Sequence, residues 1–239
     1  MFFKIRKLIS NHNFFTSYID KCYVRGIQRS GTNFLEKILE NKKIQILNYG
    51  LINKKNNIKH KHFRVQDEKN SIFMSDEYIN SIYINKLEDL NESKEQNKNI
   101  IIFKDPINWI VSINDWAIKC KWIKNNENVF LDKYFYKYLK EWDCFHSKWH
   151  YLASKYKKNI LMIQWEKILY DDIKIIEKLN NFFDNKLVFS KKDFLIENVN
   201  LSQIKKNKVE FLRNIPFSEK KKSEIYNNLN FKHFKIYND

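Results

Sequence analysis

The chain has 239 residues, of which 43% are hydrophobic and 16% aromatic, enough for one sizeable folded core. This composition excludes an intrinsically disordered chain, and three glycines and two prolines exclude a collagen-like or linker-like one. The net charge is +16, but 31 asparagines, two alanines and five arginines indicate AT-rich codon usage, so we predict no nucleic-acid partner from it. A surface of this charge would still attract an anionic substrate.

The chain begins with a basic and apolar segment, Met1–Ser10, whose apolar core is too short for a signal peptide. We expect this segment to pack on the domain, with weak contact to a membrane surface as the alternative. No apolar run approaches the ~20 residues that a transmembrane helix needs. The three cysteines, Cys22, Cys120 and Cys144, form no CxxC pair, which favours reduced thiols and a cytoplasmic location.

Short apolar runs alternate with helical patterns along most of the chain. The predicted strands are Cys22–Arg25, Ile44–Leu47, Ile58–Phe63, Ile100–Phe103 and Ile160–Ile163. The predicted helices are Thr32–Glu40, Asp76–Asn91, Pro106–Trp122, Val129–Tyr156, Asp171–Phe183 and Ser218–Leu229, and the predicted loops are Asn91–Asn99 and Asn185–Asn214. This alternation predicts an α/β fold in which helices flank a mainly parallel sheet.

Two of the three glycines, Gly26 and Gly31, lie where the first strand turns into the first helix. A tight loop leading into a helix points backbone amides at one spot, and the helix dipole adds positive charge there, which predicts an anion cradle. The spacing is that of a Walker A loop, but Thr32 and Asn33 replace its lysine and hydroxyl residue. An ATPase or kinase would lack two essential groups, whereas transfer of a singly charged sulfuryl group without a metal needs neither.

A second motif follows the strand Ile100–Phe103. Lys104 ends the strand, Asp105 is a plausible N-cap, Pro106 suits the first helical position, and Ser112 falls in the second helical turn. Lys104 and Ser112 are therefore expected near the carboxyl edge of the sheet, where open α/β sheets bind their ligands.

Histidines supply the candidate base. His60 and His62 alternate along the predicted strand Ile58–Phe63 and therefore point to the same face. Imidazole suits proton removal because it titrates near neutral pH. We favour His62, which is nearer the end of the strand, with His60 as the alternative.

The segments Arg29–Leu35 and Lys104–Ser112 together resemble the two phosphate-binding motifs of the sulfotransferases that use 3′-phosphoadenosine 5′-phosphosulfate (PAPS). The resemblance covers about Cys22 to Phe183. It implies a three-layer fold of the P-loop type, PAPS as donor, adenosine 3′,5′-bisphosphate (PAP) as product, and no metal. It also implies a small-molecule or glycan acceptor that gives its hydroxyl or amine proton to His62.

Residue by residue, the resemblance implies a role for each matching position. The loop residues Arg29, Ser30, Gly31, Thr32 and Asn33 would hold the 5′-phosphate. Arg29 would also contact the oxygen that links sulfur to phosphorus.

The resemblance also assigns the second motif. Lys104 and Ser112 would hold the 3′-phosphate, with Lys104 in place of the usual arginine. The charge is kept at that position, and the bidentate contact of a guanidinium is lost.

Weaker signals lie further along the chain. Trp165 and Glu166 follow a strand and are interpreted as structural. His146 and His150 are four residues apart, a spacing that could bind zinc, but without a third ligand they are interpreted as ordinary surface histidines of a helix.

Two further groups of residues have open interpretations. The basic residues Lys205, Lys206, Lys208 and Arg213 are either a solvated run of charge or a loop that closes over the 3′-phosphate. The tryptophans could line an acceptor cleft or pack in the core; these are Trp109, Trp116, Trp122 and Trp149.

The sequence as a whole predicts one domain over residues 1–239, with a core at about 22–183 and a C-terminal loop and helix at 184–239. Its predicted activity is sulfuryl transfer from PAPS. A P-loop nucleotide-binding protein or kinase is the main alternative. A binding protein that has lost its chemistry, and a basic nucleic-acid binder, are the others.

Overall fold

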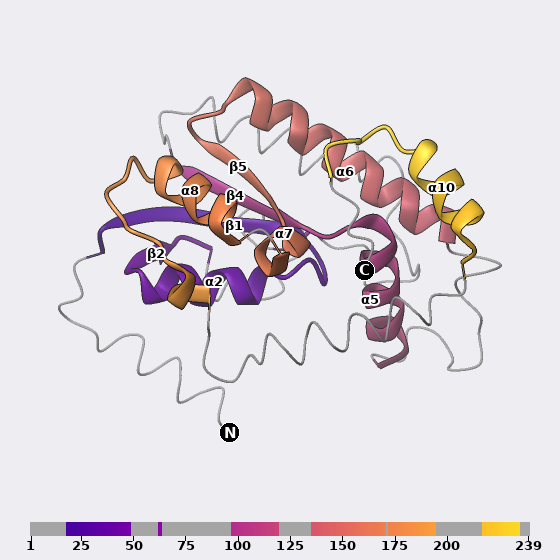
Figure 1. The fold of residues 1–239 in the computed structure, drawn as a ribbon, viewed down its shortest axis with the longest axis horizontal. Coiled ribbons are helices and arrows are strands. Elements are labelled where there is room, and N and C mark those ends of the chain that lie inside the picture. Colours follow the sequence, from indigo (N-terminus) through magenta and orange to yellow (C-terminus); the bar gives the residue numbers. More distant parts are fainter. Residues whose placement is uncertain are drawn as a thin grey trace.

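The computed structural model describes residues 18–48, 62–63, 97–119, 135–170, 172–194 and 217–234. Its centre is a parallel β-sheet in the order β2-β1-β4-β5, with the short strand β3 paired to β1 (Figure 1). The strands are β1 (Asp20–Ile27), β2 (Ile44–Ile46), β3 (His62–Phe63), β4 (Lys98–Phe103) and β5 (Ile160–Gln164).

The two central strands carry the two phosphate motifs. β1 pairs with β4 from Cys22 opposite Lys98 to Arg25 opposite Ile101, so both strands run in the same direction and end at the same edge of the sheet. The loop after β1 and the residues after β4 are therefore neighbours in space. This arrangement is the one that ligand sites of open α/β sheets use.

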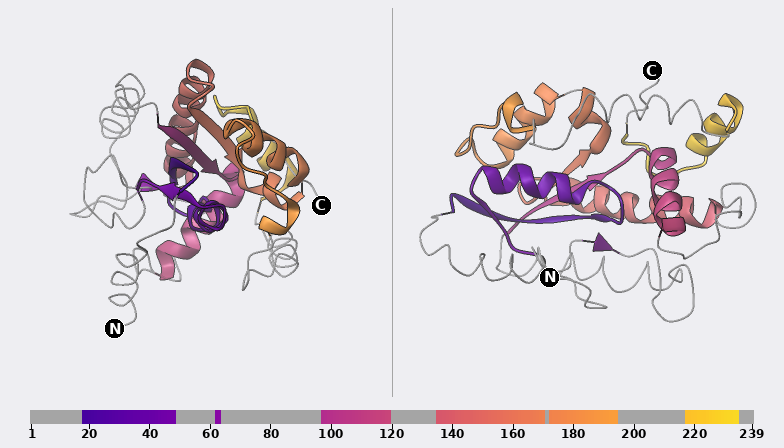
Figure 2. Two further views of the ribbon diagram at one scale, coloured as in Figure 1. Left: turned by 90° about the vertical axis from the view of Figure 1, so that its left-hand side faces the viewer. Right: turned by 90° about the horizontal axis from the view of Figure 1, so that it is seen from below.

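Helices cover both faces of the sheet (Figure 2). One face packs against α5 (Pro106–Lys119), α6 (Phe135–Lys155) and α10 (Glu219–Asn227). The other packs against α2 (Thr32–Asn41), α7 (Trp165–Tyr170), α8 (Asp172–Phe182) and the 3-10 helix η1 (Lys191–Phe194). The predicted α/β fold with three layers is thereby confirmed.

The side chains of β4 show why the sheet is covered on both faces. Ile100 and Ile102 are buried in the core beneath α2 and α8, while Ile101 and Phe103 are buried in the core beneath α5 and α6. A strand with two buried faces needs apolar residues at every position, which explains the continuous run of hydrophobic residues in the sequence.

Several expectations differ from the observed elements. α7 follows β5 without a loop and was not predicted, because six residues are too few to show a helical period. η1 lies within the predicted loop Asn185–Asn214. β4 begins at Lys98, inside the predicted loop Asn91–Asn99, because Lys98 pairs with Cys22 of β1.

Other expectations lie wholly or partly outside the described residues. These include Met1–Ser10, most of the strand Ile58–Phe63, the helix Asp76–Asn91, Cys120, the end of the helix Pro106–Trp122, the start of the helix Val129–Tyr156, and most of Asn185–Asn214. Within the described part of the chain no helix is long and apolar enough to cross a membrane. The division into a single domain stays a prediction.

Of the described cysteines, neither Cys22 nor Cys144 forms a disulfide. Cys22 is buried, and burial raises the pKa of its thiol, with Asp20 adding to the rise. A thiol in this environment is inert toward oxidants. The expectation of reduced cysteines stays a prediction.

Candidate functional site

The loop between β1 and α2 is built around left-handed backbone positions. Arg29 has a φ of 69° and Gly31 a φ of 104°. A Cβ atom on Gly26 would lie 2.7 Å from the carbonyl oxygen of Ile102 and would clash with Ser30 Oγ. Both glycines therefore have the backbone reason that their position in a glycine-poor chain predicts.

Ser30 closes the loop on itself. Its Oγ donates to the carbonyl oxygen of Ile27 at 2.7 Å, and its side chain is fully buried. Gly31 is the N-cap of α2 and has no side chain to bond the first amides, and the first turn holds no acidic residue. The positive end of α2 therefore faces the loop without a carboxylate of its own helix, as an anion site requires.

The remaining side chains of the loop differ in exposure. Thr32 is buried and Asn33 is exposed, both in the first turn of α2. The exposed guanidinium of Arg29 lies with Cζ 4.9 Å from the ring centroid of Trp116 on α5, a cation–π contact. Partial burial raises the pKa of Asp115 next to Trp116, and the positive charge of Arg29 works against this rise.

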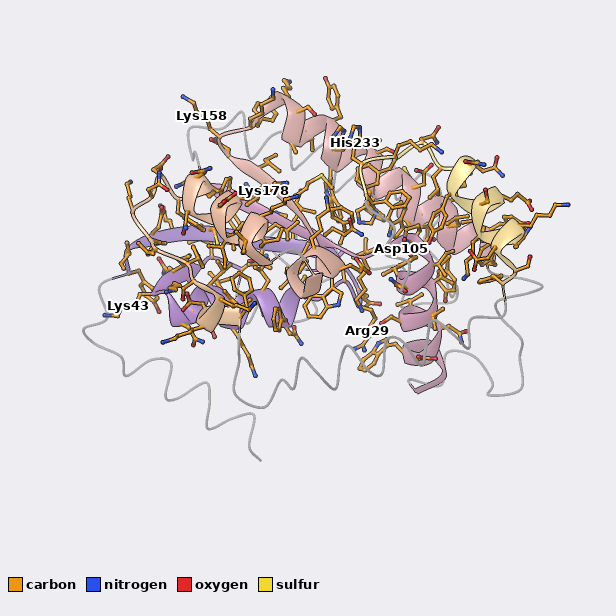
Figure 3. The ribbon with its side chains drawn as sticks, viewed as in Figure 1. Arg29, Lys43, Asp105, Lys158, Lys178 and His233 are labelled. Atoms are coloured by element: carbon orange, nitrogen blue, oxygen red, sulfur yellow. The ribbon has the colours of Figure 1, made fainter. Side chains whose placement is uncertain are left out.

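The second motif lies at the same edge of the sheet. Lys104 Nζ donates to Ser112 Oγ at 3.3 Å, across two turns at the start of α5. Lys104 is half-buried. The structure thus brings the two predicted partners of the 3′-phosphate into direct contact. Figure 3 labels Asp105, the residue after Lys104, and Arg29 of the first loop.

Several hydrogen bonds fix the backbone on both sides of Lys104. Its carbonyl oxygen accepts from Trp142 Nε1 at 3.1 Å. The next amide, that of Asp105, donates to both carboxylate oxygens of Glu166 at 3.1 Å. Asn108 Nδ2 donates to the same Glu166 at 2.9 Å, so Glu166 on α7 binds the turn that starts α5. The structural role expected for Glu166 is therefore explained.

Asp105 caps α5 as expected. Its Oδ1 accepts the amides of Ile107 and Asn108 at 2.9 and 3.1 Å. Burial and the nearby carboxylate of Glu166 raise the pKa of Asp105 to about 7, although its hydrogen bonds from Asn108, Tyr226 and Ile107 oppose the rise.

α5 also contacts the first loop directly. Trp109 Nε1 donates to the carbonyl oxygen of Gln28 at 2.7 Å. Because Trp109 and Ser112 lie on one helix, the same rigid element holds the loop at Gln28 and carries the hydroxyl beside Lys104. α5 therefore connects the two motifs, each of which has a cation, Arg29 and Lys104.

The strand that carries the candidate base His62 pairs with β1 next to the first loop. In β3, His62 pairs with Gly26 and Phe63 with Ile27, where β1 enters the phosphate loop. The side chain of His62 and all of His60 lie outside the described residues. The choice between the two histidines stays a prediction.

The helix histidines are not both on the surface, so that expectation was wrong for His146. His146 is fully buried, its Nδ1 lies 2.6 Å from the carbonyl oxygen of Trp142, and burial lowers its pKa to about 3. The apolar face of α6 includes His146 because it lies one turn after Trp142. His150 stacks on His233 with ring centroids 3.6 Å apart. Among the described residues no cluster of three histidines, cysteines or acids could hold a metal.

Three tryptophans can now be placed. Trp109 and Trp149 are fully buried in the core, which excludes them from an acceptor cleft, while Trp116 lies partly buried beside Arg29. Trp122 and the basic residues of 205–213 lie outside the described part. The sequence held a signal for the position of Trp116. Residues four apart lie on the same face of a helix, so Trp116 could have been expected on the face of α5 that carries Ser112.

The fold is that of an α/β protein, with the loop after β1 and the Lys104–Ser112 pair at the same edge of the sheet. No family model and no curated protein match the chain. Among solved structures it is similar to the crystal structure of mouse sulfotransferase SULT7A1 complexed with PAP, at 14% identity and a TM-score of 0.39. The match covers 80% of this chain and 66% of that one.

Proposed function

We propose that this protein is a sulfotransferase that moves a sulfuryl group from PAPS to the hydroxyl or amine of a small-molecule or glycan acceptor. The observation that carries the proposal is the contact of Lys104 with Ser112, at the sheet edge shared with a P-loop that lacks the Walker lysine. Such a pair gives a second phosphate a charged donor and a hydroxyl, separate from the first loop.

The two phosphates of the donor would be held at separate places. The amides of residues 29–33, with the dipole of α2, suit the 5′-phosphate, and Lys104 with Ser112 suits the 3′-phosphate. Nothing in this arrangement requires a metal, because Arg29 and the helix end supply the positive charge.

The reaction has a simple balance. The acceptor oxygen forms a bond to sulfur, the bond from sulfur to the 5′-phosphate oxygen breaks, and PAP leaves. The acceptor's proton passes to His62, with His60 as the alternative base. Arg29 stabilises the negative charge that grows on the leaving phosphate, which is where electrostatic catalysis has most effect. Arg29 cannot give up a proton, so it is not the acid for the leaving group.

The main alternative is a nucleotide-binding protein or kinase of the P-loop type. Thr32 and Asn33 stand where such proteins place the lysine and the hydroxyl that serve the β- and γ-phosphates and Mg²⁺. Hydrolysis of ATP that depends on Mg²⁺ would favour this alternative. A cytoplasmic location, PAPS as donor and the absence of a nucleic-acid partner belong to the same proposal.

Binding of nucleotides to the purified protein tests the proposal. PAP should raise the melting temperature more than AMP or ATP with Mg²⁺ at equal concentration, because only PAP fills both phosphate positions. Equal shifts from PAP and AMP would show that Lys104 and Ser112 hold no 3′-phosphate, and the donor assignment would fall.

A further inference from the structure

The C-terminal segment, residues 217–234, reaches the nucleotide side of the sheet through Tyr226. This side chain of α10 donates its hydroxyl hydrogen to Asp105 Oδ2 at 3.0 Å. The two residues are 121 positions apart in the sequence. The contact therefore joins the end of the chain to the turn that carries Lys104.

The two oxygens of Asp105 have different partners. Oδ1 caps α5 by accepting the amides of Ile107 and Asn108, while Oδ2 accepts the hydroxyl of Tyr226. A carboxylate held at one oxygen loses the freedom to rotate about its last torsion. The Tyr226 hydroxyl therefore keeps Oδ1 directed at the first turn of α5.

This turn sets the geometry of the proposed 3′-phosphate pair. Lys104 directly precedes Asp105, and Ser112 lies two turns into the helix that Asp105 caps. Trp142 holds the Lys104 carbonyl and Glu166 holds the Asp105 amide. These bonds fix the backbone, and the carboxylate of Asp105 links the cap of α5 to Tyr226.

The segment has other anchors that do not involve the site. Asp143 on α6 accepts the amides of Asn230 and Phe231 at 2.9 and 2.7 Å. Lys221 Nζ donates to Tyr136 Oη at 2.8 Å. Loss of the Tyr226 hydroxyl alone would leave these bonds in place, so its effect on the site can be measured without detaching α10.

We propose that Tyr226 is a positioning residue for the 3′-phosphate pair, acting through Asp105 to hold Lys104 and Ser112 in binding geometry. The inference rests on the proposed function. It assigns a role in donor selectivity to the C-terminal helix: the helix favours nucleotides with a 3′-phosphate over those without one.

The test compares PAP with AMP, which differ only in the 3′-phosphate, by calorimetric titration of the full chain. Tyr226→Phe should raise the Kd of PAP about fivefold to tenfold, the effect of losing one ordinary hydrogen bond. The Kd of AMP should change less than about twofold, because AMP does not use Lys104. A merely structural loss would weaken both nucleotides alike.

Tyr136→Phe is the matched control. This variant also removes one tyrosine hydroxyl, which accepts a hydrogen bond from Lys221 of α10. The Tyr136 ring is exposed, and its hydroxyl bonds Lys221 and not Asp105. The ratio of the two Kd values should stay at its wild-type value in this variant. A change in the ratio as large as that of Tyr226→Phe would overturn the proposal.

A double-mutant cycle with Lys104→Ala sharpens the test. Once Lys104 is absent, Tyr226→Phe should change the Kd ratio clearly less than it does in wild type, because coupled residues are not additive. Full additivity, or equal loss of PAP and AMP affinity in Tyr226→Phe, would refute the positioning role. Wild-type protein that does not prefer PAP over AMP would instead refute the proposed function, before any variant is made.

Discussion

Arg29 is held by a contact that a bound phosphate can replace. Its guanidinium lies over the ring of Trp116 at 4.9 Å. An exposed cation–π contact contributes about 0.5–1 kcal/mol, whereas hydrogen bonds to charged groups contribute about 1.5–3 kcal/mol. The larger energy decides the outcome, so we expect Arg29 to leave Trp116 for the 5′-phosphate when a donor binds.

Lys104 should act through binding. Lys104→Ala removes the charge beside Ser112 and should weaken PAP binding by about 1.5–3 kcal/mol, the range for a hydrogen bond to a charged group. The transfer rate at saturating PAPS should change little, because the 3′-phosphate is remote from the reacting sulfur. Calorimetry and saturation kinetics measure the two effects separately.

Lys98→Ala is the matched control for this prediction. Lys98 begins the strand that Lys104 follows, and it pairs with Asp20 and Asp184 at 3.1 and 3.0 Å. The Lys98→Ala variant removes one positive charge at the opposite end of β4 from Lys104, so its PAP affinity should stay near that of the wild type. A collapse of the saturated rate in Lys104→Ala with unchanged PAP affinity would place Lys104 among the catalytic residues.

His62 should act through chemistry. A positioned general base contributes typically about 10²–10⁴-fold, so His62→Ala should slow transfer by this factor. PAP affinity should stay within about threefold, because a base that takes the acceptor's proton need not contact the nucleotide. Steady-state kinetics with PAPS and nucleotide titration measure the two quantities.

The control for His62→Ala is His60→Ala, which should lower the transfer rate by about tenfold or less. The wild-type rate should also rise between about pH 5.5 and 7.5, where an ordinary imidazole loses its proton, and this rise should disappear in His62→Ala. If His60→Ala is inactive and His62→Ala is nearly normal, the base is His60. If neither variant is slow, the catalytic assignment fails while the donor site stands.

At the scale of elements, α5 connects the two parts of the site. Its first residue follows the Asp105 cap, and its length carries Trp109, Ser112 and Trp116 along one side. These three side chains contact the Gln28 carbonyl, Lys104 and Arg29 in that order. A single helix thereby sets the spacing between the two cationic positions, and the stability of its cap matters for both.

The cap of α5 should make stability depend on pH. The pKa of Asp105 rises from an ordinary 3.8 to about 7 because of burial and of Glu166. The folded protein therefore keeps a proton that the unfolded chain releases above about pH 4. Folding becomes less favourable as the pH rises from about 4 to about 7, and the lost stability is not regained above pH 7.

Asp105→Asn removes this titration and keeps an oxygen that can cap the helix. The melting temperature of the variant relative to wild type should therefore increase between pH 5 and pH 8. Thermal unfolding at several pH values measures this difference, in which other titrating groups such as His146 cancel. Glu166, whose charge raises the pKa of Asp105, and Tyr226, whose hydroxyl donates to it, are present in both proteins. A difference that stays constant over this range would contradict the prediction.

Asp193 provides a control of opposite sign. Its partial burial would raise its pKa, but hydrogen bonds from Lys42 and Ser190 outweigh this and lower it. An acid with a lowered pKa stabilises the fold above its unfolded pKa and loses that contribution as the pH falls. Asp193→Asn should therefore destabilise the protein at pH 7, and the difference from wild type should shrink in acid.

At the scale of the whole molecule, the sheet separates two cores that support different parts of the site. The core beneath α2 and α8 supports the helix that follows the first loop, and the core beneath α5, α6 and α10 supports the second motif and includes Ile27 at the start of that loop. Other lysines form ion pairs away from the proposed site: Lys42 pairs with Asp193, and Lys98 pairs with Asp20. The site therefore depends on the cations at one edge of the sheet, and the net charge of +16 adds only long-range attraction of anions.

The sequence by itself determined the elements and motifs whose signal is local. The strand Ile100–Phe103 is a continuous apolar run, the loop around Gly26 and Gly31 has a fixed spacing, and Ser112 follows Lys104 by eight residues. Periods, turns and caps depend on residues close in the chain, so they can be predicted without knowing the packing. The parallel sheet followed from the alternation of these elements.

Only the tertiary structure decided which side chains meet across elements. The bond of Tyr226 to Asp105, the contact of Arg29 with Trp116 and the burial of His146 all depend on how helices dock on the sheet. Packing of this kind is set by the shape and volume of side chains far apart in the sequence, and no local period records it. The sequence therefore predicts where phosphates could bind, while the fold alone joins the C-terminal helix to that place.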